Sequence, residues 1–338
     1  MLRFDVCRAA TAEIKVRRLS AGEKCVSNAA AVRTEKESMR SSRNNASANA
    51  AARICLWMLL ANLWLTTAAV KVADAQTPPS LTAEEKLEQD FTDPLTTLPQ
   101  LLVRDSYSPA NYGTHVQTNQ VIIRPIIPRV PSFTLLPFVQ LIRPTFAVVT
   151  VPSPRGGSRT EFGDMQLFDI AVLPWPRRES GWLIGVGPTF VFPTATSTSA
   201  GQGAWQAGPA LGLIYKGIRG LLVGFIVQNP VSFAYTSPKR VPVNTLEIQP
   251  VMALHLYGKW YLRSAEANWM VGWRRHTPTT LPLSIGIGRT FVRLGLPPMS
   301  FFVTGQWTAY RQFAPFTQQT TINFGLTMAF PWLRDEFE

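Results

Sequence analysis

Apolar and polar residues alternate along most of the chain after residue 96, which is the pattern of half-buried β-strands. In the last such run one parity holds the large apolar residues Ile322, Phe324, Leu326, Met328 and Phe330. The other parity, from Thr321 to Ala329, holds Thr, Asn, Gly and Ala. Twelve strands are predicted in this way, near residues 97–107, 118–128, 134–150, 164–174, 181–193, 204–216, 221–234, 245–257, 259–273, 281–294, 300–313 and 319–330.

The connections between these strands alternate in length. One set is short (RVPS, PRRESG, KGIRG, YGK, GLPPM), and the other is longer and polar (VPSPRGGSRTEFG, TATSTSAGQG, YTSPKRVPVN, RRHTPTT). An even strand number with short turns at one rim and long loops at the other is typical of outer-membrane barrels. The sequence therefore predicts an all-β fold: a transmembrane antiparallel up-and-down β-barrel of about 12 strands. A secreted soluble β-sandwich is the alternative, because its strands also alternate.

Aromatic residues favour the membrane barrel over the sandwich. Trp and Tyr side chains gather at the membrane–water interfaces of such barrels, which lie near the strand ends. The residues expected in these girdles are Trp175, Trp182, Trp205, Tyr215, Trp260, Tyr261, Trp273, Tyr310 and Trp332.

The region before the strands divides into a leader and a short helix. Residues 55–70 (CLWMLLANLWLTTAAV) form an apolar run with arginines before it and the small-residue site Ala73-Asp74-Ala75 after it, the order of a signal peptide. We expect a start at Met39, a leader over 1–75 with cleavage after Ala75, a helical periplasmic segment over 76–95 and a barrel over 96–338. The helix is predicted at 81–91 (LTAEEKLEQDF), with Thr82 and Glu85 as a capping box.

Charge, cysteines and histidines limit the chemistry. Much of the formal charge of +12 lies in the leader, and residues 76–338 carry 21 Lys/Arg against 15 Asp/Glu without a basic cluster, so no nucleic-acid partner is expected. All three cysteines lie in the leader, at Cys7, Cys25 and Cys55. The histidines, His115, His255 and His276, accompany no catalytic or zinc motif. We expect no enzyme, no catalytic residue, no metal and no cofactor.

Six predicted strands contain an internal proline that follows a small or polar residue, although proline has no N–H group to donate to the hydrogen bonds between strands. The pairs are Arg124-Pro125, Arg143-Pro144, Gly187-Pro188, Gly208-Pro209, Asn229-Pro230 and Gln249-Pro250. In all but Asn229-Pro230 the alternation directs the first residue inward and the proline toward lipid. The alternation therefore directs Arg124, Arg143 and Gln249 to the lumen. Together with Asp169, Glu247, His255, Glu266 and Asn268 they make up the predicted lumen lining. These residues either select solutes or pair with one another to stiffen the wall.

The segments GWLIGVGPTFVFPTAT (181–196) and AWQAGPALGL (204–213) resemble bacterial outer-membrane barrels of the putative MetA-pathway of phenol degradation family. Further similarity occurs in DPLTTLPQLLVRDSYSP, IIRPIIP, EFGDMQLFDIAVLPWP and TLEIQPVMAL. The resemblance covers nearly all of residues 93–331 and implies a passive conduit with a link to aromatic catabolism. The chain departs from other outer-membrane barrels at its end, where PWLRDEFE follows Phe330.

The expected function is passage of small molecules, including hydrophobic or aromatic ones, across the outer membrane of a Gram-negative bacterium. Its expected partners are outer-membrane lipid, the assembly machinery and the solutes themselves. A structural or interaction barrel without flux is the second hypothesis. A secreted soluble β-protein is the third.

Overall fold

The computed structural model describes residues 83–113, 116–129, 140–153, 157–173, 180–273, 278–293, 295–314 and 317–333. The expected signal peptide, its cleavage site and the capping residue Thr82 lie outside these ranges, as do His115, His276 and Trp175. One α-helix, α2 (Ala83–Thr92), precedes the strands and matches the helix predicted at 81–91. No helix in the described ranges is long and apolar enough to cross a membrane.

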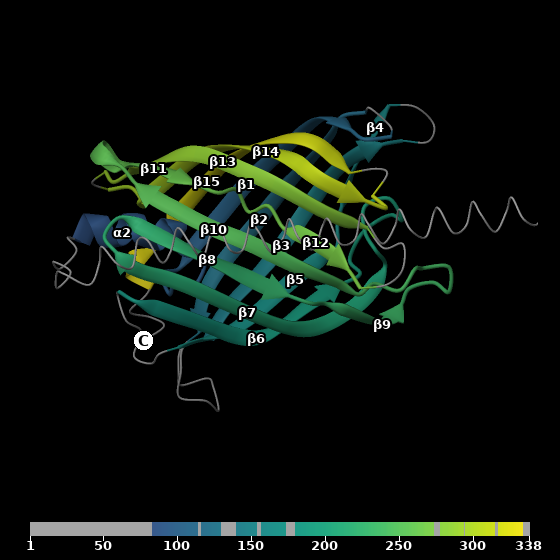
Figure 1. Ribbon diagram of the computed structural model, residues 1–338, viewed down its shortest axis with the longest axis horizontal. Helices are drawn as coiled ribbons and strands as arrows, with labels where there is room; N and C mark the ends of the chain where they lie inside the picture. Colours follow the sequence, from purple (N-terminus) through teal and green to yellow (C-terminus); the bar gives the residue numbers. More distant parts are fainter. Residues whose placement is uncertain are drawn as a thin grey trace, which may run out of the picture. The chain divides into compact units, whose positions relative to one another are not determined.

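All strands belong to one antiparallel sheet (Figure 1). They are β1 (Gln100–Asn111), β2 (Thr118–Arg129), β3 (Gln140–Pro152), β4 (Ser158–Phe162), β5 (Met165–Leu173), β6 (Trp182–Phe192), β7 (Ala204–Ile218), β8 (Leu221–Gln228), β9 (Val231–Tyr235), β10 (Thr245–His255), β11 (Trp260–Arg263), β12 (Trp269–Gly272), β13 (Thr279–Phe291), β14 (Met299–Gln312) and β15 (Gln318–Ala329). Two short 3-10 turns lie at Tyr257–Lys259 and Pro331–Leu333.

The sheet closes on itself, because β1 pairs with both β2 and β15. Three of the twelve passages across the wall are interrupted. β4 and β5 both pair with β3, β8 and β9 both pair with β7, and β11 and β12 both pair with β10 and β13. Every passage therefore pairs with the passages before and after it in the chain, so the predicted 12-stranded up-and-down barrel is confirmed.

The connection predicted as the loop VPSPRGGSRTEFG is mostly a hairpin. β3 continues to Pro152, and β4 pairs with it from Val148 to Pro152. This hairpin and β9 lie at the end of the barrel opposite α2 (Figure 1).

Side-chain parity separates an apolar outer surface from a polar interior. On β15 the outer residues Ile322 and Phe324 are exposed, whereas the inner residues Thr321, Asn323 and Thr327 are buried. The inner polar groups bond one another: Asn323 Nδ2 donates to Thr304 Oγ1 at 3.0 Å. Apolar-out and polar-in alternation is the arrangement of a barrel surrounded by lipid.

Aromatic pairs stand on the outer surface near both ends of the strands. The rings of Trp182 and Tyr215 lie 4.8 Å apart where β6 begins and β7 ends, and those of Phe192 and Trp205 lie 5.7 Å apart at the other end of the same strands. Tyr261 was expected in these girdles, but it is only 1% exposed. Its ring instead points inward and covers the backbone at Gly288, where a Cβ would overlap the phenol.

The prolines meet across neighbouring strands. Pro188 pairs directly with Pro209. Between β2 and β3 the ladder stops at Ile123–Phe146 and resumes in the same register at Ile127–Ile142, so Pro125 lies opposite Pro144 in the gap. Placing two prolines opposite each other puts both missing N–H groups at one local break, which limits the disturbance of the remaining ladder.

We expect Gly187→Ala to destabilise the barrel by about 1–3 kcal/mol, the usual cost of overpacking. The reason is that a Cβ at Gly187 would overlap the carbonyl oxygen of Asp169 on β5, and backbone cannot move aside as a flexible side chain does. The matched control is Gly305→Ala, because the atom nearest to a Cβ there is 3.9 Å away. Urea unfolding in lipid vesicles measures the free energy of unfolding of both variants. Equal values for the two variants would contradict the close contact between Gly187 and the Asp169 carbonyl.

Candidate functional site

Glu266 reaches the lumen because one wall passage breaks between β11 and β12. The pairing of β10 shifts by one residue across this break, from Ala253–Arg263 to Ile248–Trp269. The intervening backbone is held by other bonds: Ser264 N donates to Met252 O at 2.9 Å, and Ala265 N donates to Ser284 Oγ at 3.0 Å. The break is therefore an ordered inward bulge with Glu266 at its centre.

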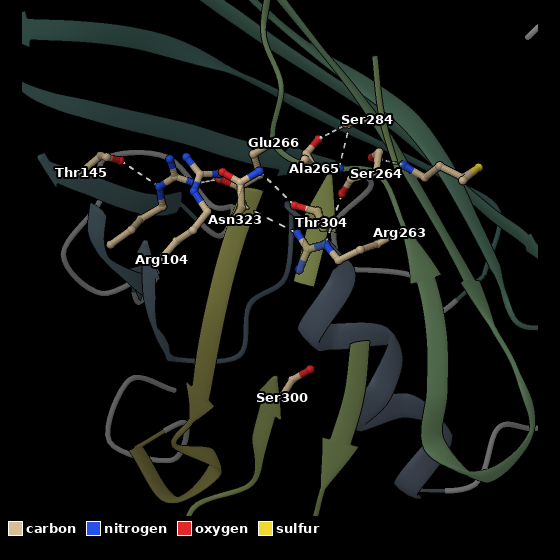
Figure 2. Close-up of polar contacts among 12 residues, drawn as sticks. Arg104, Thr145, Arg263, Ser264, Ala265, Glu266, Ser284, Ser300, Thr304 and Asn323 are labelled. Carbon is tan, nitrogen blue, oxygen red and sulfur yellow. Dashed lines mark hydrogen bonds and ion pairs between the residues drawn. The ribbon is translucent and has the colours of Figure 1, made fainter. Parts of the chain in front are cut away.

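Three arginines contact the Glu266 carboxylate, and Figure 2 labels two of them, Arg104 and Arg263. Arg104 Nη1 donates to Oε2 at 3.1 Å, Arg124 Nη1 contacts the same oxygen, and Arg263 Nη2 lies 4.0 Å from Oε1. Arg124 Nε also donates to Thr145 Oγ1 at 2.9 Å, and the Arg263 guanidinium lies 4.0 Å from the centre of the Phe302 ring. All three arginines are at least nine-tenths buried. One carboxylate thus holds three cations, which leaves the cluster with excess positive charge.

Arg143 lies beside this cluster but does not bond Glu266. Its residue is 5% exposed, and its guanidinium carbon lies 4.7 Å from the centre of the Phe168 ring. Within the described ranges its guanidinium makes no hydrogen bond and no ion pair, and its Nε is buried without an acceptor. A buried guanidinium whose N–H groups lack an acceptor is costly, so an added hydrogen-bond acceptor at Arg143 would be favourable.

A second polar group comes from β5, β6, β8 and the region around β10. Gln228 Nε2 and Asn268 Nδ2 donate to Glu247 Oε2 at 2.7 and 2.9 Å. Gln166 Nε2 and Thr189 Oγ1 donate to Gln228 Oε1 at 2.9 and 3.0 Å. Amides therefore satisfy Glu247, whereas arginines satisfy Glu266.

Two cavities meet at the arginine cluster. The larger, about 350 Å³, is lined by Arg104, Arg124, Arg143 and Glu266 together with amide and hydroxyl side chains such as Gln120, Gln228, Asn268 and Asn323. The smaller, about 50 Å³, lies against residues Phe91–Pro94. Arg124, Arg143, Gln249 and Glu266 line both cavities. These four side chains therefore stand between the large cavity and the segment that follows α2.

Helix α2 lies at the end of the barrel opposite β4 and β9 (Figure 1). Leu95 is fully buried in an apolar cluster with inner residues of the wall, including Phe168, Ile170 and Leu183. It rests on the paired glycines Gly185 and Gly212, where an added Cβ would come within 2.8 and 3.1 Å of its methyl groups.

Polar contacts hold the same segment, which we call the plug (residues 83–98). Lys216 Nζ lies 2.9 Å from Asp93 Oδ2, and both side chains are almost fully buried. Gln100 Nε2 donates to Asp90 O at 2.9 Å, and His255 lies near α2, with Nδ1 3.6 Å from Glu88 Oε2. The plug is therefore fixed by packing and by an ion pair, not by chain connectivity alone.

The residues predicted to line the lumen fall into four places. Arg124, Arg143, Gln249 and Glu266 meet at the cluster, and Glu247 and Asn268 bond each other nearby. His255 faces the plug. Asp169 is placed on the other face of β5, because its neighbours Phe168 and Ile170 are buried inside and side chains alternate along a strand.

Arg104, Arg263 and the Asp93–Lys216 pair were not anticipated from the sequence. Arg104 shares the parity of Ser106 and Ser108, a polar inner face that could have identified it. Arg263 ends the run WYLR directly before the break in the wall. No group of three His, Cys, Asp or Glu side chains suited to a metal occurs in the described ranges.

Comparison with solved structures finds outer-membrane barrels of very low sequence identity. The alignment with the KdgM porin covers 68% of this chain and 99% of the porin, at 7% identity and a TM-score of 0.41. That with the COG4313 outer membrane channel from Pseudomonas putida F1 covers 75% of this chain and 100% of the channel, at 10% identity and a TM-score of 0.47. No protein-family model and no curated protein matches the sequence. The likeness therefore concerns the fold, which the strand pairing establishes independently.

Proposed function

We propose that this barrel gives small molecules a path across the outer membrane, through the large cavity and past the arginine cluster. The observation that carries the proposal is the cavity of about 350 Å³ lined by charged and amide side chains. A wall that only needed to be stable would gain more from apolar packing, because buried ions cost desolvation energy. The plug must move for a solute to complete the passage.

Small hydrophobic or aromatic solutes are the proposed cargo. Support comes from the sequence resemblance to the MetA-pathway family and from the Phe168 ring and the apolar side chains beside the cavity, such as Ile122 and Met270. Pockets that bind small organic molecules are commonly 300 Å³ or larger and combine apolar walls with a few polar groups.

Liposome swelling tests the proposal with purified full-length protein. Small neutral solutes of increasing size are expected to enter at a rate that falls steeply with size. Folded protein that admits no solute, even when the plug is displaced, would favour the second candidate, a barrel without flux. The observation that favours a barrel without flux is the plug, which is held by a buried ion pair and by apolar packing.

Arg143→Glu is expected to reduce the preference of the pore for anions. The change replaces a buried cation at the junction of the two cavities by an anion, so the local field changes by two charges. The reversal potential under a KCl gradient measures the preference. Arg289→Glu is the control, because Arg289 lies on the outer surface over the rings of Trp260 and Phe291. An unchanged reversal potential in conducting Arg143→Glu protein would leave Arg143 only a structural role.

A further inference from the structure

We infer that Arg143 is the anchor of a binding site for small organic monocarboxylates inside the large cavity, an assignment that rests on the proposed passage of solutes and names their class. The guanidinium is buried and points to a cavity, and no acceptor in the described ranges reaches it. A free, planar set of N–H donors matches the two oxygens of a carboxylate, which accept two parallel hydrogen bonds.

The neighbouring charges single out Arg143 from the other arginines. Arg104, Arg124 and Arg263 already contact Glu266. Asp164, the other carboxylate at the large cavity, already accepts the backbone N–H groups of Ala195 and Gln202, at 3.2 and 2.6 Å. Both acids are therefore occupied, and an incoming acceptor meets Arg143 without displacing an existing ion pair.

The charge of the lining fits one negative charge on the ligand. The side chains around the large cavity include three arginines, Arg104, Arg124 and Arg143, and two carboxylates, Asp164 and Glu266. The net lining charge is thus +1, and a monoanion neutralises it. A dianion would leave an uncompensated negative charge in a site of low solvent exposure, which is unfavourable.

The surroundings of Arg143 also fit an organic body better than a bare ion. The guanidinium carbon of Arg143 lies 4.7 Å from the centre of the Phe168 ring, so an aromatic face packs against the cation. Gln166, Gln249 and Asn268 supply amides for further polar groups, while Ile122, Ala147 and Met270 supply apolar surface. A cavity of about 350 Å³ has room for a single-ring acid.

Equilibrium binding tests this site without requiring flux. Benzoate is titrated calorimetrically into the detergent-solubilised full chain at low salt, with benzamide as the neutral analogue of the same shape. We expect benzoate to bind, benzamide to bind at least tenfold more weakly, and Arg143→Gln to weaken benzoate binding at least tenfold. Arg143→Lys should retain part of the affinity, because it keeps the charge but loses the planar fork. Arg289→Gln, on the outer surface, should bind benzoate like the unmodified protein.

Two results would overturn the site: benzoate affinity unchanged in folded Arg143→Gln protein, or benzamide binding as tightly as benzoate. Inorganic phosphate is tested as a competitor. If phosphate displaces benzoate at equal concentration, the site binds anions in general and the assignment to carboxylates is wrong. If benzoate binds to a barrel that admits no solute, the proposed passage of solutes is wrong and the carboxylate site stands. Solute entry without benzoate binding would refute the site and keep the passage.

Discussion

Replacing Glu266 by glutamine lowers the free energy of unfolding by about 3 kcal/mol, within the range for breaking a buried ion pair. The carboxylate is the shared partner of Arg104, Arg124 and Arg263, all of them buried. Glutamine keeps the shape but removes the charge, so three guanidinium groups would repel one another without a counter-ion. Urea unfolding in vesicles is the measurement.

Two further variants make the result specific to Glu266. Arg104→Met should cost less than Glu266→Gln, because Arg124 and Arg263 would still hold the carboxylate. Glu85→Gln removes the partner of Arg219 in an exposed ion pair and should cost less than about 1 kcal/mol. If Glu266→Gln were no more damaging than Glu85→Gln, the cluster would not be a determinant of stability.

Gly212→Leu is expected to displace the plug and to raise solute entry into liposomes. The three atoms nearest to a Cβ at Gly212 all belong to Leu95 of the plug, the closest of them a methyl group at 3.1 Å, so a larger side chain at 212 competes with Leu95 for its place. Removing a buried leucine from its site costs about 2–5 kcal/mol. Because 1.4 kcal/mol is a factor of ten in an equilibrium, entry should rise on the order of tenfold or more.

The double variant Gly212→Leu with Leu95→Ala provides the matched control. The leucine introduced at 212 then fills the space that Leu95 vacates, so solute entry should return close to that of the unmodified protein. Such non-additivity is expected only for residues in contact. Equal entry in the single and double variants would show that Leu95 does not seat the plug.

The strand number and the two faces of the barrel were predictable because alternation is a local property. β15 carries large apolar residues on one parity and small or polar ones on the other, and β6 does the same except at Leu183 and Val191. β5 was different. Its inner residues Phe168, Ile170 and Val172 pack with Leu95 of the plug, so both parities are apolar and alternation gave Asp169 no side.

The partners inside the lumen were not predictable, since they depend on closure of the ring. Glu266 and Arg104 are separated by 162 positions in the chain, and Lys216 and Asp93 by 123. These pairs follow from the register of the closed barrel and from the entry of the plug, neither of which a strand pattern contains. Glu266 was among the residues predicted for the lumen, but only the structure identified the three arginines that contact it.

Single-channel recording in a KCl gradient tests the central claim, a solute path through a lumen of excess positive charge. The purified full-length protein and Gly212→Leu are each inserted into planar bilayers. We expect discrete openings that favour chloride, with a larger open fraction for Gly212→Leu. Absence of current from both folded proteins, or a current that favours potassium, would contradict the claim.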